Sequence, residues 1–479
     1  MQHTAAASTA EKARGADSRS WALLVLLTVA QFMVIIDMTV VNVALPSIGR
    51  SLGFSNAADL QWVVSAYVLV TGGLVLLGGR AADLLGRRRM FLTGLLTFTA
   101  ASLASGLAPS PVALVGARAA QGLGASMLTP SALSIIATSY TGAQRAAGLA
   151  VWGTVGAAGS AAGVLLGGAL TTTLGWQSVF FINVPIGIIA AGLALQMVPS
   201  APARIRDLRE LDIPGALTLI AGLVLLVLAI QGTAVAGVSS ARTLIPLALS
   251  AGLLAAFGLV ERQAAQPLIP TFIWRVRSLV SGTIVMLGAT AIMAGTSFLN
   301  SLYLQRVYGA SALDTGLAFL PATLVIIIAA NLASRVLPHV GTKVVLALGL
   351  IVTASGTFYL AQMPEHPTYF ANVLPGLLAI GMGLGLSFVS VSITAMAVVR
   401  EEIAGVASGL MTTGHETGAA FGVATLSAIA SAVAISGSFA GGYRVGQWVA
   451  TLIAGGLLLV TVLVLPAIRP PAGAVGRMH

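Results

Sequence analysis

Long apolar runs alternate with short polar breaks along almost the whole chain. A run of about 20 apolar residues is long enough to cross the hydrocarbon core of a bilayer as a helix. This criterion predicts about fourteen membrane-spanning helices in an all-α membrane protein. The predicted spans are 21–46, 58–79, 90–108, 111–136, 145–170, 178–198, 213–234, 243–261, 279–304, 314–335, 342–362, 370–398, 403–433 and 446–467.

The spans fall into three groups, which two polar stretches separate. Six spans precede 199–212, two lie between it and 261–277, and six follow. Two parallel six-helix repeats with a substrate site between them are a recurrent transporter architecture. We therefore predict two six-helix bundles joined by a segment with two additional helices. The predicted organisation is a mobile cytoplasmic tail (1–20), an N-terminal bundle (21–198), a linker with the two extra helices (199–277), a C-terminal bundle (278–467) and a second cytoplasmic tail (468–479).

The composition supports a membrane protein. Hydrophobic residues make up 57% of the 479 positions and charged residues only 8%, whereas soluble proteins carry about 25% charged residues. A net charge of +10 would suit a nucleic-acid partner, but the placement of the charges opposes that interpretation. When alternate loops are assigned to opposite sides, most of the 24 basic residues gather on one side. The exceptions are Arg50, Arg242, Arg306 and Arg444 in the opposite loops and Arg118 within a span.

The positive-inside rule makes the basic side cytoplasmic, which places both termini there. The first apolar run is too long for a secretory signal, so we expect it to be retained as a span. Two lysines against 22 arginines, with abundant Ala and Gly, indicate a GC-rich bacterial genome. We therefore expect a multi-pass protein of the bacterial cytoplasmic membrane.

Motifs for metal, cofactor or enzyme chemistry are not found in the sequence. The chain has no cysteine, which excludes a disulfide framework and a thiol metal site. We also find no zinc-ligand spacing, phosphate-cradling loop or Ser–His–Asp set in a plausible context. A membrane-embedded enzyme is therefore disfavoured, and neither a metal nor a cofactor is expected.

One acid, Asp37, lies inside the first span. A carboxylate in hydrocarbon costs about 2.5–3.5 kcal/mol on insertion scales. Such a residue needs a watery cavity, a partner or a proton, and each of these suggests transport. The alternative is an interfacial Asp that caps a helix end. The distance of Asp37 from the start of the span, about 24 Å at 1.5 Å per residue, opposes that alternative.

Arg118 lies within the fourth span, roughly 13 Å below the outer surface. A guanidinium keeps its proton at neutral pH, so it needs a carboxylate, water or carbonyl groups. Asp37 is the acid at matching depth in the first six spans, and we expect the two to interact directly or through water. The alternative is that backbone carbonyls and Gln121 satisfy Arg118.

His415 and Glu416 lie in the thirteenth predicted span. If that helix begins near Ile403, Glu416 is about 20 Å deep, and a deep glutamate beside an imidazole could hold a proton. If the span begins later, the pair lies near the cytoplasmic face and is structural.

Several further residues have both a functional and a packing interpretation. Candidates to line a cavity are Asn42, Gln121, Phe298, Asn300 and Tyr303. Packing explains the last three equally well. Small residues let membrane helices approach closely, so the glycines of the fifth span predict either static packing or a sliding seam. These glycines are Gly159, Gly163, Gly167 and Gly168.

Ordered motifs along the chain resemble one family. The motifs are Asp37–Pro46 (DMTVVNVALP), Gly79–Arg89 (GRAADLLGRRR), Arg118–Gly124 (RAAQGLG), Gly159–Gly168 (GSAAGVLLGG), Gly175-Trp176, Phe180–Pro185 (FFINVP) and Leu302–Gln305 (LYLQ). Together they resemble the fourteen-helix drug/proton antiporters of the major facilitator superfamily. The resemblance implies a proton-coupling role for Arg118. It also implies a conformational role for the loop residues Gly79, Asp83, Gly86, Arg87 and Arg88.

The chain departs from the family pattern at three places. Val164 stands where the fifth-helix motif usually has proline, which weakens the motif-based case for export over import. Leu84 replaces a common basic residue, and Gln177-Ser178 replaces a usual Arg-Trp pair. None of these changes affects Asp37 or Arg118.

These observations predict a proton-coupled antiporter that exports small amphipathic, often cationic compounds by alternating access. The expected partners are a small-molecule substrate, protons and the lipid bilayer, with no nucleic acid and with a monomeric chain. Alternatives are an exporter dedicated to one antibiotic or metabolite, a passive facilitator or channel, and a solute sensor that does not transport.

Overall fold

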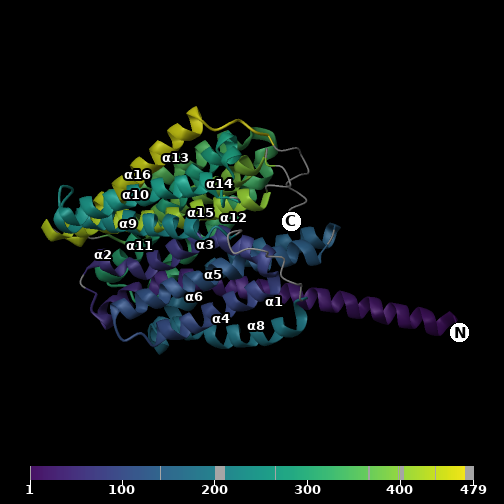
Figure 1. Cartoon of the computed structure of the whole chain (residues 1–479). Helices are drawn as coiled ribbons and strands as arrows, with labels where there is room; N and C mark the ends of the chain where they lie inside the picture. Colours follow the sequence, from purple (N-terminus) through teal and green to yellow (C-terminus); the bar gives the residue numbers. More distant parts are fainter. Residues whose placement is uncertain are drawn as a thin grey trace.

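A computed structural model of the protein describes residues 2–54, 56–140, 142–199, 211–264, 266–364, 367–397, 399, 404–436 and 438–469. These residues form helices joined by short connections, with no strand among them (Figure 1). Fourteen long segments result when α7 is counted with α8 and η3 with α14, which confirms the predicted fold class. The bounds are α1 Gln2–Leu52, α2 Ala57–Leu60, α3 Trp62–Leu85, α4 Arg87–Gly106, α5 Pro111–Ser139, α6 Gly142–Leu174, α7 Ser178–Phe181, α8 Asn183–Met197, α9 Ile213–Ala236, α10 Ala241–Gln263, η2 Thr271–Arg275, α11 Arg277–Arg306, α12 Ala312–Val340, α13 Thr342–Ala361, η3 Tyr369–Val373, α14 Leu374–Met396, α15 Ala404–Ser436 and α16 Phe439–Leu463.

Twelve of the described segments are long and apolar enough to cross a membrane by themselves. The other two are α4, which begins with three arginines, and α5, which carries Arg118. Both pack against other helices of the N-terminal half: α4 lies along α5 and α8, and α5 also lies along α3. An even number of crossings brings the start of α1 and the end of α16 to the same side. We call that side the terminal face and the opposite side the distal face.

The predicted limits differ most from the structure at α16, which begins at Phe439 rather than at 446, and at the distal end of α1 and the terminal end of α3, which ends at Leu85 rather than at 79. The expected end of α1 at residue 46 is wrong, because the helix continues past Pro46 to Leu52. Membrane helices tolerate proline where neighbouring groups satisfy the freed backbone. At the other end α1 begins at Gln2, so 2–20 continues the helix out of the bundle (Figure 1). The mobility of this tail stays a prediction, and 200–210 and 470–479 of the predicted linker and second tail lie outside the described residues.

The two halves of the molecule repeat one packing scheme. In the first half α1 lies along α6, while α5 lies along both α3 and α4. In the second half α11 lies along α15, while α14 lies along both α12 and α13. The order of the helices along the chain is the same in both sets, so the halves are parallel repeats of the kind found in many transporters.

The halves meet along α3–α15, α6–α12 and α1–α11. Glycine permits the α6–α12 contact, because a Cβ on Gly168 would lie 2.7 Å from the Ala312 carbonyl oxygen. Towards the distal face, Ser301 donates to the Asn42 carbonyl (2.8 Å) and Gln305 Nε2 donates to the Val43 carbonyl (3.0 Å). These bonds hold the halves together on that side in this structure.

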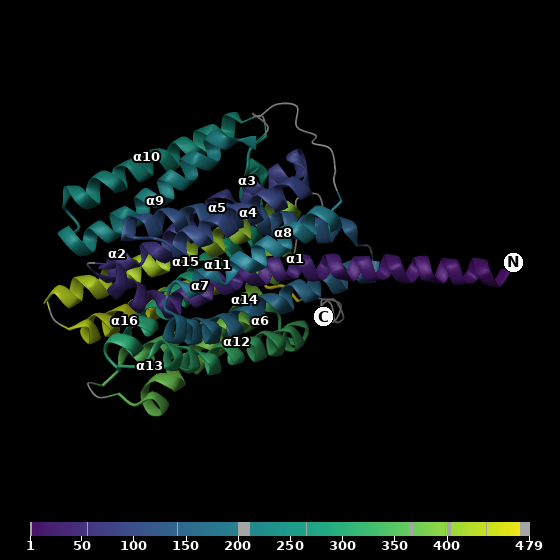
Figure 2. The ribbon, with the colours of Figure 1, turned by 90° about the horizontal axis from the view of Figure 1, so that it is seen from below.

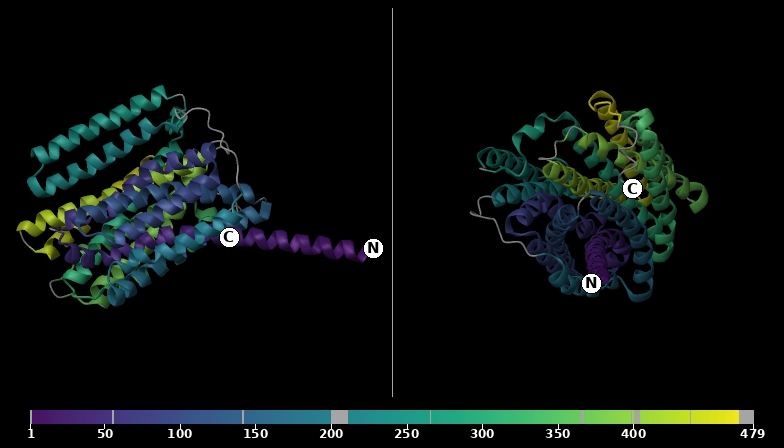
Figure 3. Two further views of the ribbon diagram at one scale, coloured as in Figure 1. Left: turned by 60° about the horizontal axis from the view of Figure 1, so that its bottom comes forward. Right: turned by 90° about the vertical axis from the view of Figure 1, so that its right-hand side faces the viewer.

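Helices α9 and α10 form a hairpin on one side of the bundle (Figures 2 and 3). Helix α9 packs on α10, α15 and α3. Near the distal face, Trp62 Nε1 donates to Gln231 Oε1 (2.7 Å), and Gln231 Nε2 donates to Asp59 Oδ1 (3.0 Å). Large apolar side chains of α10, such as Ile245, remain exposed (58%) and would face lipid.

Candidate functional site

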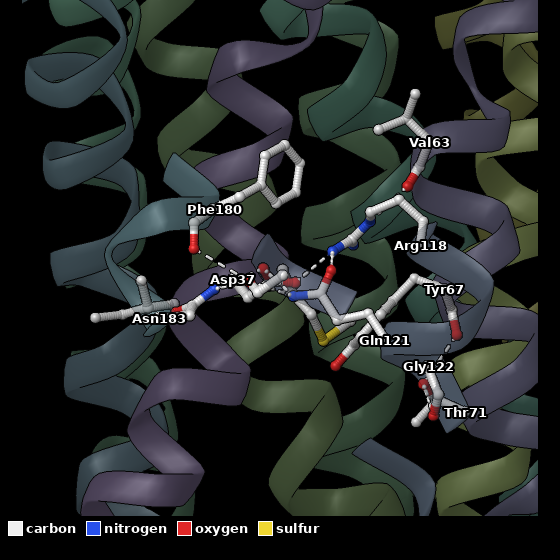
Figure 4. Close-up of polar contacts among 12 residues, drawn as sticks. Asp37, Val63, Tyr67, Thr71, Arg118, Gln121, Gly122, Phe180 and Asn183 are labelled. Carbon is white, nitrogen blue, oxygen red and sulfur yellow. Dashed lines mark hydrogen bonds and ion pairs between the residues drawn. The ribbon is translucent and has the colours of Figure 1, made fainter. Parts of the chain in front are cut away.

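The first candidate site is an ion pair buried between α1 and α5. Arg118 Nη1 lies 2.5 Å from Asp37 Oδ2, and the side chains of Arg118 and Asp37 are 1% and 0% exposed. The Arg118 side chain also donates from Nε to the Val63 carbonyl (2.9 Å) and from Nη1 to Gln121 Oε1 (2.7 Å). The guanidinium therefore ties together α1, α3 and α5 (Figure 4). Both partners proposed for Arg118, the carboxylate and the carbonyl–Gln121 set, are present at once.

The second carboxylate oxygen of Asp37 accepts two further hydrogen bonds. Gln121 Nε2 donates at 2.7 Å and Asn183 Nδ2 at 3.0 Å. Both amides also donate to Ser102 Oγ, at 3.1 Å and 2.9 Å, and Ser102 donates to the Phe180 carbonyl (3.1 Å). An ionised carboxylate only accepts hydrogen bonds, so this environment suits the charged form of Asp37.

Two aromatic rings enclose the guanidinium of Arg118. The Tyr67 ring centroid lies 4.4 Å from Cζ of Arg118, and the Phe180 centroid lies 5.8 Å away. A cation over an aromatic face is stabilised by about 0.5–2 kcal/mol, more when water is excluded. The Tyr67 hydroxyl is buried without a hydrogen-bond partner. Tyr67 thus contributes its ring to the site and keeps a polar group available.

Asn183, Ser102 and Tyr67 were not predicted as site residues. Asn183 lies in the FFINVP motif quoted above, so its place in the sequence was visible but its proximity to Asp37 was not. Ser102 is one serine in a helix rich in alanine and serine, and nothing in the sequence separates it from its neighbours. A five-helix contact of this kind depends on tertiary packing that spacing along one helix does not encode.

Glu416 lies at the contact between the two halves. It is 8% exposed on α15, and its Oε2 atom has no hydrogen-bond partner. Its Oε1 atom lies 3.5 Å from Nδ1 of His415, whose side chain is 34% exposed. Because α15 begins at Ala404, Glu416 lies about 18 Å along the helix at 1.5 Å per residue. The helix therefore begins close to the position that the deep placement of Glu416 requires.

The backbone of α3 packs closely against Glu416. A Cβ on Gly72 would lie 2.6 Å from Cβ of Glu416, and Thr413 Oγ1 donates to the Gly72 carbonyl (2.9 Å). This acid is therefore held at the surface where α3 and α15 move past each other if the halves rock.

The cavity candidates on α11 are packed in the C-terminal half. Phe298, Asn300 and Tyr303 are 0%, 3% and 2% exposed. Asn300 Oδ1 accepts from the Tyr443 hydroxyl (2.7 Å) and from Gln447 Nε2 (3.2 Å). The packing interpretation describes these residues in this structure, since Asn300 and Tyr303 contact Tyr443 of α16 and Phe298 is fully buried. Asn42, by contrast, is half-buried and donates to the Met38 carbonyl (3.1 Å), while its Oδ1 atom is buried without a partner.

The predicted conformational residues lie at the end of α3, at Gly86 between the helices and at the start of α4. Gly86 separates the helices at φ 102°, a region that favours glycine. Arg87 Nη2 lies 3.4 Å from Asp83 Oδ1, and Arg87 Nη1 donates to Thr138 Oγ1 on α5 (2.9 Å). Arg88 donates to the Leu195 carbonyl on α8. Gly79 faces Pro130 of α5, where an added Cβ would lie 3.6 Å away.

The glycines of α6 divide between two neighbours. Gly159, Gly163 and Gly167 face α1, where a Cβ would meet Phe32 and Ile35, Thr39, and the Val40 backbone. Gly168 faces α12 in the other half. Close packing within one half and close packing between halves are therefore both built into this motif. Among the residues that the structure describes, no three His, Asp or Glu side chains gather as metal ligands would.

Comparisons with known proteins agree with this architecture. The sequence model of the Major Facilitator Superfamily matches residues 27–423. The cephamycin export protein CmcT of Amycolatopsis lactamdurans is 40% identical over 84% of this chain and 83% of its own length. The puromycin resistance protein pur8 of Streptomyces alboniger is 38% identical over 86% and 82%. The lincomycin resistance protein of Streptomyces lincolnensis is 36% identical over 97% and 95%.

A solved structure also resembles this chain. The crystal structure of the human organic anion transporter MFSD10 superposes with a TM-score of 0.57 at 15% identity, covering 92% of this chain and 99% of that one. At this identity the likeness concerns the fold alone.

Proposed function

The chain belongs to the Major Facilitator Superfamily and is a membrane-spanning transporter rather than an enzyme, and from this premise we propose that it exports small amphipathic, often cationic antibiotics or other toxic compounds in exchange for protons. The observation that carries the proposal is the sealed ion pair of Asp37 and Arg118. Ionisable residues inside a membrane span commonly mark ion pathways and proton relays.

Protonation of Asp37 would weaken its contact with Arg118. A neutral Asp37 no longer balances the charge of Arg118, and the oxygen that takes the proton becomes a donor. A proton on Oδ2 removes the acceptor that faces Arg118, while Oδ1 can still accept from Gln121 and Asn183. The carboxylate has no solvent access in this structure, so proton entry requires the distal contacts of α1 and α11 to open. Such gating by one repeat against the other is alternating access.

The proton gradient across the membrane is large enough to drive the exchange of substrate for protons. One elementary charge that crosses 100 mV gains about 2.3 kcal/mol. About 1.4 kcal/mol corresponds to a tenfold concentration ratio, so one proton suffices for useful export of a neutral substrate. Exchange of one proton for one monovalent cation moves no net charge, so export of a cation needs a second proton or a pH difference across the membrane.

Glu416 is the proposed second acid of the pathway. Its free Oε2 atom and the partly exposed His415 beside it offer a carboxylate to a cationic substrate or to a second proton. Because Glu416 packs against Gly72 of α3, binding of a cation or a proton to Glu416 would affect the contact between the halves.

The relatives also favour a second candidate, a dedicated exporter. The cephamycin, puromycin and lincomycin proteins are each named for a single antibiotic. Export of a panel of chemically unrelated compounds by reconstituted protein supports the multidrug form, and export of one compound class supports the dedicated form. A passive facilitator or channel would show flux that is independent of the proton gradient, and a sensor would show no flux.

Topology and assembly are part of the proposal. We place the protein in the bacterial cytoplasmic membrane as a monomer, with the terminal face in the cytoplasm. The chain has no cysteine, so single cysteines at Ser110 (distal) and Lys343 (terminal) can be labelled without a background. A membrane-impermeant maleimide added to intact cells should label the first and spare the second, and the reverse pattern would overturn the orientation.

The decisive test is uptake of a lipophilic cation driven by a pH gradient in everted vesicles. Wild-type protein should accumulate the cation, and Asp37→Asn should abolish gradient-driven uptake while the protein remains folded. Asp314→Asn is the matched control, because Asp314 is an exposed acid in the helix cap of α12. Wild-type uptake by Asp37→Asn would overturn the mechanism.

A further inference from the structure

Two acids that are far apart in the sequence are neighbours at the terminal end of the hairpin formed by α9 and α10. Asp212 precedes α9 and is 5% exposed, and Glu261 lies in the last turn of α10 and is 7% exposed. Their carboxyl groups lie within hydrogen-bonding distance of each other. Neither acid has a role in the transport mechanism proposed above.

The hydrogen bonds of these acids leave one oxygen without a donor. Glu261 accepts from the backbone N–H of Leu268 through Oε1 (3.2 Å) and from that of Ile269 through Oε2 (2.9 Å). Asp212 Oδ1 accepts from the N–H of Gly215 (3.2 Å), but Asp212 Oδ2 is buried with no hydrogen-bond donor. Two ionised carboxylates cannot hydrogen-bond, because both only accept. A proton on one of them supplies the missing donor and removes the repulsion of two buried like charges.

The acids hold a segment that also binds the N-terminal half. Arg80 of α3 donates to the carbonyls of Gln266 (2.8 Å) and Pro267 (3.4 Å) and to the Gln266 side chain. Leu211, next to Asp212, packs with Ala81, Ala82 and Met90 at the loop between α3 and α4. The connection from α10 to α11 is therefore fixed on one side by Arg80 and on the other by Glu261.

Among the described residues, Asp212 is the charged group that acts on Glu261. The cations on the neighbouring elements are Arg80 of α3, Arg87, Arg88 and Arg89 of α4, Arg262 of α10, Arg275 of η2 and Arg277 of α11. Of these, Arg80 contacts the segment held by Glu261 through its carbonyl oxygens.

We propose that Asp212 and Glu261 form a proton-binding site that shares one proton between two carboxyl groups and latches the extra hairpin to the N-terminal half. While the proton is bound, Glu261 stays beside Asp212 and holds the N–H groups of Leu268 and Ile269. When the proton leaves at high pH, two negative charges in contact repel and Glu261 releases the segment. The site is separate from Asp37 and responds to the solution at the terminal face.

Hydrogen–deuterium exchange of full-length protein in nanodiscs tests the latch. We follow peptides that contain Leu268 and Ile269 from about pH 5 to about pH 9, with rates corrected for intrinsic exchange. This range lies above the ordinary carboxyl pKa of about 4, so a change within it reports a proton that the pair retains. In the wild type, exchange of these amides should accelerate by about tenfold or more as pH rises, because like charges at contact repel strongly in a buried site. In Asp212→Asn the amide donates to Glu261 without a second charge, so protection should persist across the range.

Two controls separate a proton site from a merely structural contact. Arg80→Gln removes the other attachment of the same segment, so it should lower protection equally at every pH. Glu261→Gln also removes the shared proton. The remaining protection of the Leu268 and Ile269 amides in this variant should not depend on pH. If either acid variant fails to fold, the other still tests the proposal.

Three results would overturn the latch. One is an identical pH profile in the wild type and Asp212→Asn. Another is protection at high pH that rises with sodium concentration but not with choline, because a bridging cation would then replace the proton. The third is a wild-type profile that shifts in Asp37→Asn, which would assign the pH response to the transport site. Failure of the latch leaves the drug/proton exchange proposal standing, since Asp37 is intact in all the hairpin variants.

Discussion

Removal of the charge from Arg118 should destabilise the N-terminal half strongly, because it leaves a buried carboxylate without its cation. Breaking a buried ion pair by loss of one partner costs about 3–5 kcal/mol. Arg118→Gln should fall in the upper part of that range, since it also removes the hydrogen bond to the Val63 carbonyl (2.9 Å) and the cation over Tyr67. Asp37→Asn should cost less, because Arg118 keeps the Val63 carbonyl and Gln121 Oε1 as acceptors.

The double variant Asp37→Asn/Arg118→Gln makes the reasoning quantitative. It contains no unpaired charge, so its loss of stability should be smaller than the sum of the two single losses by about 2–3 kcal/mol. The free energy of unfolding in mixed micelles, measured by denaturant titration with tryptophan fluorescence, gives all four corners of the cycle. Simple additivity would refute the claim that these side chains form one energetic unit.

The same cycle on an exposed pair calibrates the result. Arg87 and Asp83 lie 3.4 Å apart with side chains 38% and 63% exposed. Surface pairs are stabilised by only about 0–1 kcal/mol. The coupling in Asp83→Asn/Arg87→Gln should therefore be close to zero, and a coupling as large as that of the buried pair would mean that the assay does not report burial.

Four other changes have definite expected outcomes. Gly72→Ala should slow transport and lower thermal stability, because the new Cβ would lie 2.6 Å from Cβ of Glu416, whereas Gly116→Ala meets nothing within 4 Å and should be neutral. Asn183→Ala should lower gradient-driven uptake more than binding, since it removes one of the donors to Asp37; unchanged uptake would exclude a role. Tyr67→Phe should leave stability within about 0.5 kcal/mol, as the hydroxyl has no partner, and a thermal melt checks this. Glu416→Gln should reduce uptake of cations more than that of neutral compounds, and equal loss for both would contradict a carboxylate contact with substrate.

The sequence predicts the helices well because their signal is local. Runs of apolar residues and the short basic turns between them mark where each crossing begins and ends, to within a few residues for most helices. Helices α4 and α5 were predicted at 90–108 and 111–136, close to their observed bounds, although α4 begins with three arginines and α5 carries Arg118 and Gln121. Their burial depends on packing against α3 and α8, which no single-helix criterion registers.

The sequence predicted only the part of the site in which a buried charge requires a partner of opposite charge. A lone Asp37 and a lone Arg118 at matching depth imply each other, and the structure places them in contact. Neutral groups make no such demand, so Asn183 and Ser102 carried no signal of their proximity. The same limit applies to Asn300, whose polar side chain is satisfied by Tyr443 and Gln447 across a helix contact rather than by a cavity.

The length of the extra hairpin matters for the choice of lipid. Helices α9 and α10 contain 24 and 23 residues, so each is roughly 35 Å long at 1.5 Å per residue. That length exceeds the usual hydrocarbon thickness of about 30 Å, and a long helix responds by tilting or by thickening the membrane around it. Since α10 presents most of its side chains to acyl chains along one edge of the protein, short-chain lipids would strain that edge. Turnover should therefore depend on acyl-chain length more strongly than in a relative that lacks the hairpin.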